Sequence, residues 1–185
     1  TLENSGTREE GYCLLYHVNA GYPMLDAGAR LFDDAEEAVP RTSWAARYAE
    51  SRREMKAPVP NEEEMCYFIK LKTPRVSLGN AALGKVFSLE WSGDTLPHFV
   101  EWKSMAAGDY ALGLEPCTTE LDGKFAYSML GAGERVQFRL SLRVQDLCPL
   151  LLFGAGNGAL LPLCPLRRGR SRAQKKEYIQ YQTCL

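Results

Sequence analysis

Apolar and polar residues alternate strictly along residues 135–144. Val136, Phe138 and Leu140 fall on one side, and the positions between them are arginine or glutamine. Because successive side chains of a strand point to opposite faces, this period of two predicts a half-buried antiparallel strand with one solvated face. Residues 65–72 repeat the pattern and predict a second strand of the same kind.

Short strands separated by turn signals continue through the middle of the chain. Residues 74–91 contain two strand-like runs joined by a turn over Gly79–Gly84, which predicts a hairpin. Residues 98–105 and 110–116 follow as two more strands around the turn at Gly108. This spacing predicts a mostly β chain that forms a large antiparallel sheet or β-sandwich. Helix is expected in one place.

The predicted helix covers residues 42–56. Thr42 or Ser43 could cap its first turn, and Trp44 and Tyr48 begin a loose apolar stripe at helical spacing. No other segment of comparable length has this periodicity, so we expect the remaining ordered chain to be β-structure.

Composition and charge narrow the classes of partner. The chain has 185 residues, 45% of them hydrophobic, which is enough for one ordinary core. Its formal net charge of -1 gives no overall field to attract nucleic acid or an anionic membrane, so we expect a small or neutral partner. Six cysteines lie far apart without a C-x-x-C pair, which argues against a metal site and favours reduced thiols in the cytoplasm.

Residues 148–185 depart from the strand pattern. They form an apolar run interrupted by proline and glycine, followed by six lysines or arginines against one acidic residue. The interruptions argue against a membrane-spanning helix, and the basic run lacks the aromatic residues of a nucleic-acid-binding arm. We therefore expect residues 1–147 to form part of the β-sandwich and residues 148–185 to be an irregular tail that is either disordered or foreign to it.

Two polar side chains stand out on the predicted strands. Glu115 shares a strand face with Ala111 and Gly113, which are too small to fill the space beside a carboxylate. His17 ends a short strand where the chain turns. A hydrogen-bonded turn histidine is the simpler interpretation of His17, and the same holds for His98.

Three blocks then resemble a known family. "LLYHVNAGYPMLDAGARL", "LPHFVEWKSM" and "YALGLEPCT", in this order, resemble the aldose 1-epimerase (galactose mutarotase) superfamily, and within it a bacterial epimerase-like branch of the DUF4432 type. The resemblance covers about residues 10–147. It implies the galactose mutarotase-like β-supersandwich, of which this chain would be the C-terminal portion, incomplete at its N-terminus.

The resemblance also implies roles for individual residues. His17 matches the family's general acid at the sugar ring oxygen, and Glu115 matches the base that takes the proton of the anomeric hydroxyl. The side chains expected to contact the sugar are His98, Trp102, Lys103 and Asn19. No metal and no organic cofactor is expected, because one carboxylate and one imidazole suffice for this chemistry.

Alternative functions remain open at this stage. The first is an isomerase that interconverts the α and β anomers of a free aldose. The second is a carbohydrate-binding β-sandwich without catalysis, and the third is an inactive fragment. Neither the identity of the sugar nor the oligomeric state follows from the sequence.

Overall fold

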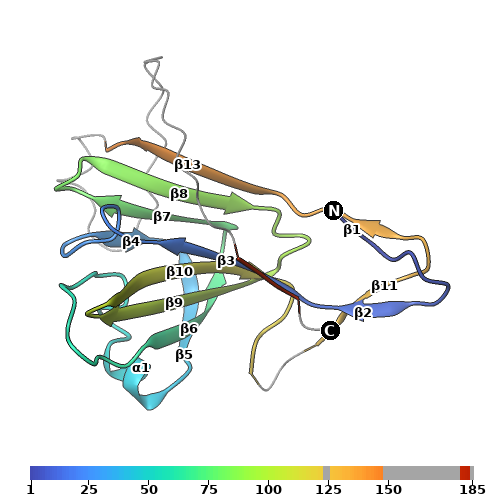
Figure 1. Ribbon diagram of the computed structural model, residues 1–185, viewed down its shortest axis with the longest axis horizontal. Coiled ribbons are helices and arrows are strands. Elements are labelled where there is room, and N and C mark those ends of the chain that lie inside the picture. Colours follow the sequence, from blue (N-terminus) through green and yellow to red (C-terminus); the bar gives the residue numbers. More distant parts are fainter. Residues whose placement is uncertain (123–125, 148–179, 184–185) are drawn as a thin grey trace.

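The computed structural model of the chain describes residues 1–122, 126–147 and 180–183, and its body consists of two antiparallel sheets (Figure 1). The six-stranded sheet contains, in spatial order, β14 (Gln180–Thr183), β3 (Leu14–Ala20), β10 (Asp109–Cys117), β9 (His98–Ala106), β6 (Met65–Leu71) and β5 (Ala35–Pro40). The four-stranded sheet contains β13 (Leu140–Asp146), β8 (Lys85–Trp91), β7 (Arg75–Asn80) and β4 (Arg30–Phe32).

The main apolar core lies between these two sheets. Leu112 of β10 is fully buried and belongs to the same cluster as Leu78 of β7 and Leu89 of β8. Trp91 of β8 stacks on Phe99 of β9 with ring centroids 5.1 Å apart. Burial of each such side chain stabilises the fold by about 1.5–3 kcal/mol. The predicted mostly β, antiparallel sandwich is therefore confirmed.

Two short ribbons extend from one end of the sandwich (Figure 1). In one, β1 (Leu2–Glu3) pairs with β12 (Arg135–Val136), and in the other, β2 (Glu10–Tyr12) pairs with β11 (Ser128–Leu130). The predicted single strand over residues 135–144 is wrong on this point. The segment divides into β12 and β13 because its first residues pair with β1 in the ribbon, whereas its later residues pair with β8 in the sandwich.

Glycines in the left-handed region form the two predicted turns. Gly84 has φ +66° between β7 and β8, and Gly108 has φ +95° between β9 and β10. A side chain at either position would be strained, since L-residues rarely adopt this backbone conformation. The predicted hairpin over residues 74–91 and the predicted turn at Gly108 are thus confirmed.

The single described helix, α1 (Ser43–Arg47), is much shorter than the predicted helix over residues 42–56. The predicted cap is correct, because the Thr42 hydroxyl accepts a hydrogen bond from the Ala45 amide at 3.1 Å. The residues after α1 form successive turns that carry Arg52 into the protein interior. These turns stand in place of the rest of the predicted helix and bring the guanidinium to the buried side chains of Asp33 and Glu101.

The strand in the first of the three sequence blocks, β3, continues further than predicted. β3 extends to Ala20, so His17 lies inside the strand and not at its end. Apart from β14, which pairs with β3, the predicted appendix over residues 148–185 lies outside the described residues. In the part of the chain that the structure describes, no helix is long and apolar enough to cross a membrane.

Candidate active site

The outer face of the six-stranded sheet carries both predicted catalytic residues. Along β10, Leu114 points into the main core, so its neighbours Gly113 and Glu115 point to the outer face. Along β3, Val18 points into the core, so His17 also points outward. The two side chains therefore share a face.

Strand pairing brings His17 and Glu115 into contact. Leu114 lies opposite Val18 in the antiparallel ladder of β3 and β10, and the next step in the same register places Glu115 opposite His17. The imidazole Nε2 lies 2.9 Å from the carboxylate Oε1. The Glu115 side chain is 4% exposed and the His17 side chain 25% exposed, so the pair is reached from the imidazole side.

Two atoms of this pair have unused hydrogen-bonding capacity. Nδ1 of His17 and Oε1 of Glu115 are buried and have no aligned hydrogen-bond partner among the described residues. The 2.9 Å contact is therefore close, but its atoms are not aligned as in a regular hydrogen bond. Buried polar atoms without aligned partners are rare in proteins, and a catalytic role is one of the few explanations for them.

Gly113 provides the space in which the pair lies. A Cβ atom at this position would come within 2.5 Å of Glu115 Oε1 and 2.9 Å of His17 Cε1. Cβ atoms do not approach other non-bonded heavy atoms this closely in proteins, so a larger residue would displace the imidazole, the carboxylate or both. The absence of a side chain at position 113 is thus a condition for the observed geometry.

The electrostatic environment favours a protonated imidazole. The contact with the Glu115 carboxylate raises the pKa of His17, burial lowers it, and the net effect is a pKa above the ordinary value of 6.5. The nearby Asn19 side chain also contributes to the increase in this pKa. At neutral pH a larger share of His17 is therefore protonated than in a solvated histidine.

Trp102 lies beside the pair on β9, opposite Gly113. Its ring meets the His17 ring edge to face, with centroids 5.7 Å apart. The indole Nε1 donates a hydrogen bond of 2.8 Å to Oε2 of Glu64, which fixes the orientation of the ring. Asn19 lies opposite Gly113 on the other side, on β3, and is exposed. These predicted contact residues therefore surround the acid–base pair.

Lys103 does not join this group. It follows Trp102 in β9 and so points to the opposite face, where it is 3% exposed. Its Nζ donates to the backbone carbonyls of Arg52 and Glu54, and burial lowers its pKa. The structure thus corrects the expectation that Lys103 borders the same hollow as Trp102.

A buried charge cluster surrounds Lys103 on the inner face. Arg52 donates to Glu101 at 2.6 Å and to Asp33 at 2.8 Å, and Arg53 also donates to Asp33 at 2.7 Å. Burial alone would raise the pKa of Asp33, but the hydrogen bonds from Arg53 and Arg52 outweigh it and hold that pKa below its usual value. In Glu101 burial dominates and raises the pKa. The cluster ties the segment after α1 to the sheet.

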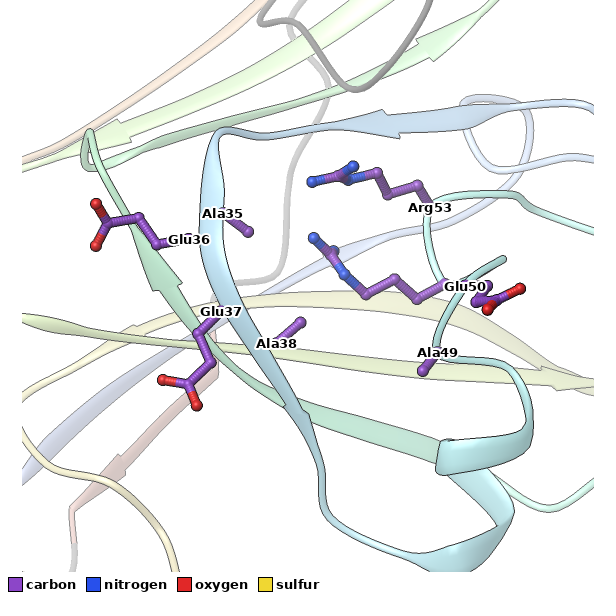
Figure 2. Close-up of a pocket in the computed structure, with 8 residues that line it drawn as sticks. Ala35, Glu36, Glu37, Ala38, Ala49, Glu50 and Arg53 are labelled. Atoms are coloured by element: carbon purple, nitrogen blue, oxygen red, sulfur yellow. The ribbon is translucent and has the colours of Figure 1, made fainter.

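A small hollow lies beside this cluster, between β5 and the segment after α1 (Figure 2). Figure 2 shows the side chain of Arg53 extending toward β5, whereas the carboxylates of Glu36 and Glu37 point away from the hollow. The volume of the hollow is about 280 Å³. The two arginines that line it, Arg52 and Arg53, already pair with buried carboxylates. We assign no ligand to this hollow.

His98 lies on the outer face at the start of β9, four residues before Trp102. It pairs across the ladder with Cys117, two positions beyond Glu115, and its side chain is 38% exposed. Its Nδ1 lies 3.8 Å from Oε1 of Glu120. His98 therefore shares the face of the acid–base pair without touching it.

The described residues offer neither a metal cluster nor a reactive thiol near the pair. Within residues 1–122, 126–147 and 180–183, no group of three or more His, Cys, Asp or Glu side chains is arranged to hold a metal ion. Burial raises the pKa of Cys66 to about 11 and that of Cys117 to about 12. Both thiols are therefore protonated near neutral pH and are poor nucleophiles.

A family model described as a domain of unknown function, DUF4432, matches residues 1–144. The chain belongs to the DUF4432 family. No curated protein matches it. This assignment agrees with the branch that the sequence blocks resemble.

Solved structures support the fold of this DUF4432 chain. A provisionally assigned aldose 1-epimerase from Klebsiella pneumoniae subsp. pneumoniae MGH 78578 is 22% identical, with a TM-score of 0.71 over 78% of this chain. The Slr1438 protein from Synechocystis sp. PCC 6803 is 14% identical, with a TM-score of 0.57 over 78% of this chain. The chain covers 41% of the first structure and 48% of the second, so it spans less than half of either. At these identities the likeness establishes a shared fold.

Sequence reasoning missed two contributors to the site. The sequence pattern indicates that Gly113 is small, but not that it makes room for both His17 and Glu115. Glu64, which holds the Trp102 indole, lies in an acidic run before β6, and no pattern distinguishes it from its neighbours. The strand parity that separates Trp102 from Lys103 was available from the sequence.

Proposed function

We propose that this chain carries the acid–base site of a carbohydrate isomerase of the aldose 1-epimerase type, which interconverts the α and β anomers of a free aldose. The observation behind the proposal is the 2.9 Å contact between His17 and Glu115 on the outer face of the sheet. A paired imidazole and carboxylate are the acid and base that anomer exchange requires. The family resemblance assigns the same two residues to these roles.

Glu115 acts as the base and His17 as the acid in the proposed reaction. The carboxylate accepts the proton of the anomeric hydroxyl while the imidazolium donates its proton to the ring oxygen, and the bond between the ring oxygen and the anomeric carbon breaks. The open-chain aldehyde rotates about its bond to C2. Closure reverses both proton transfers, so acid and base return to their starting states and no atom is gained or lost.

Substrate binding replaces the direct ion pair in this proposal. Because Nε2 and Oε1 are 2.9 Å apart, a sugar can engage both only after the partly exposed imidazole turns away from the buried carboxylate. The sugar then supplies hydrogen-bond partners to atoms that lack aligned ones. Trp102 would present an apolar ring surface to the sugar, and Asn19 a polar edge. We do not retain Lys103 as a contact.

The Glu115→Gln variant tests the catalytic assignment. Since the amide cannot accept the anomeric proton, we expect the rate of anomer exchange to fall by about 10²–10⁴-fold while sugar binding is kept. Exchange is measured by two-dimensional NMR exchange spectroscopy between α and β anomers of several aldoses, and binding by titration calorimetry.

Glu10→Gln provides the matched control, because Glu10 is exposed and lies on the β2–β11 ribbon, outside the six-stranded sheet that carries the pair. It should leave exchange unchanged. If Glu115→Gln binds sugar and exchanges anomers at the wild-type rate, the acid–base role is wrong. If the wild-type protein binds sugar but exchanges no anomers above the buffer rate, the function is recognition without catalysis.

A further inference from the structure

A second and larger hollow lies on the same outer face as the acid–base pair. Its volume is about 580 Å³, which falls within the range of about 300–1,000 Å³ typical of ligand pockets. Val39 of β5, Phe68 of β6 and Val100 of β9 form its apolar floor, and His98 lies at its margin. None of these residues belongs to the acid–base pair.

One row of cross-strand neighbours connects the pair to this hollow. Glu115 lies opposite Val100, Val100 opposite Phe68, and Phe68 opposite Val39. Adjacent strands are about 4.8 Å apart, so Phe68 lies about 10 Å across the sheet from Glu115. A sugar ring held at His17 and Glu115 would leave this hollow open to whatever the ring carries.

The chemistry of the hollow selects an uncharged, hydroxylated group. An apolar floor with an aromatic ring suits the C–H face of a sugar, and polar side chains at the margin suit its hydroxyl groups. Glu37, Glu120 and Asp122 outnumber Lys70 among the charged lining residues. This excess of carboxylates disfavours a phosphate or a uronate.

We propose that the hollow lined by Val39, Phe68, Val100 and His98 is a second subsite that holds an uncharged glycosyl substituent of the sugar bound at His17 and Glu115. This inference rests on the proposed function and narrows its substrate class. The preferred substrate is then an oligosaccharide or a glycosylated aldose with a free reducing end, and not a monosaccharide.

Val39→Trp tests the subsite, because Val39 is 44% exposed and tolerates a larger side chain that fills the hollow. Val144→Trp is the matched control, since Val144 is 60% exposed on β13 of the other sheet. Anomer exchange is measured by NMR separately for each sugar. The rate for glucose is compared with the rates for maltose and cellobiose, and the rate for galactose with that for 4-galactobiose. Thermal melts establish that both variants are folded.

For the wild-type protein we expect kcat/KM at least tenfold higher for a disaccharide than for the monosaccharide with the same reducing ring. Val39→Trp should abolish this preference by lowering the disaccharide value more than the monosaccharide value, whereas Val144→Trp should change neither value. Val39→Leu enlarges the side chain less and should reduce the preference for disaccharides only in part. It replaces Val39→Trp as the test variant if the tryptophan variant does not fold.

Equal rates for mono- and disaccharides, or an equal effect of Val39→Trp on both, would overturn the subsite and leave the proposed function standing. Exchange of no sugar at all would overturn the proposed function. In that case calorimetric titration with maltose and 4-galactobiose decides the subsite. Binding that Val39→Trp removes and Val144→Trp preserves would support it, and absence of binding would refute it.

Discussion

At the scale of single residues, the properties of His17 depend on one neighbour. The imidazole could be an ordinary strand histidine, but the Glu115 carboxylate at 2.9 Å changes its protonation and gives it a chemical partner. Gly113 makes this contact sterically possible. The charge of Glu115 and the absence of a side chain at Gly113 therefore make His17 a candidate acid and not only a structural residue.

The pKa of His17 is directly testable. We expect its NMR titration midpoint to lie above the ordinary 6.5 in the wild-type protein, and to fall toward that value in Glu115→Gln because the main cause of the increase is removed. The acid form exists below the pKa, so this increase extends the active range toward higher pH. The sequence has two histidines, and His98→Gln identifies the His17 signal. A wild-type midpoint at or below 6.5 would contradict the assigned environment.

At the scale of elements, β9 serves two purposes on its two faces. Trp102 and Val100 contribute to the outer face, whereas Glu101 and Lys103 belong to the buried charge cluster of the inner face. The cluster connects β9 to the segment after α1 through Arg52. The position of β9 within the site is therefore coupled to ionic contacts on the opposite side of the sheet.

Removal of the Arg52 charge tests how strongly the buried cluster holds β9 to the segment after α1. Arg52→Met leaves the Glu101 carboxylate without its main cation and removes one of the two from Asp33, so we expect a loss of about 3–5 kcal/mol in the free energy of unfolding. Arg47→Met in α1 is the local control, because Arg47 is exposed and lies over the Trp44 ring. It should cost less than about 1 kcal/mol. Denaturant unfolding followed by circular dichroism measures both, and similar losses would argue against the cluster as a main stabilising contact.

At the scale of the whole molecule, stability is expected to be uneven. β9 and β10 each span nine residues, each pairs with a strand on both sides, and both contribute to the main core. The ribbons β1–β12 and β2–β11 are short and lie away from the sandwich body (Figure 1). The acid–base site is therefore built on the most strongly paired part of the fold.

Hydrogen exchange should reflect this difference. We expect amides of β9 and β10 to exchange only through global unfolding, and amides of the two ribbons to exchange at least about 100-fold faster through local opening. Mass-spectrometric hydrogen exchange of the native protein gives both rates. Equal protection of ribbons and central strands would mean that the ribbons unfold only together with the sandwich.

The sequence by itself determined the central strands from β6 to β10, the two glycine turns between them and the face on which their residues lie, because period two and turn chemistry are local properties. Because successive side chains of a strand point to opposite faces, the sequence already places Trp102 and Lys103 on different faces of the sheet. Only the tertiary structure decided which strands are neighbours. It paired β3 with β10, split residues 135–144 between two partners and ended α1 at Arg47. These outcomes depend on contacts between segments far apart in the chain, which local periodicity does not encode.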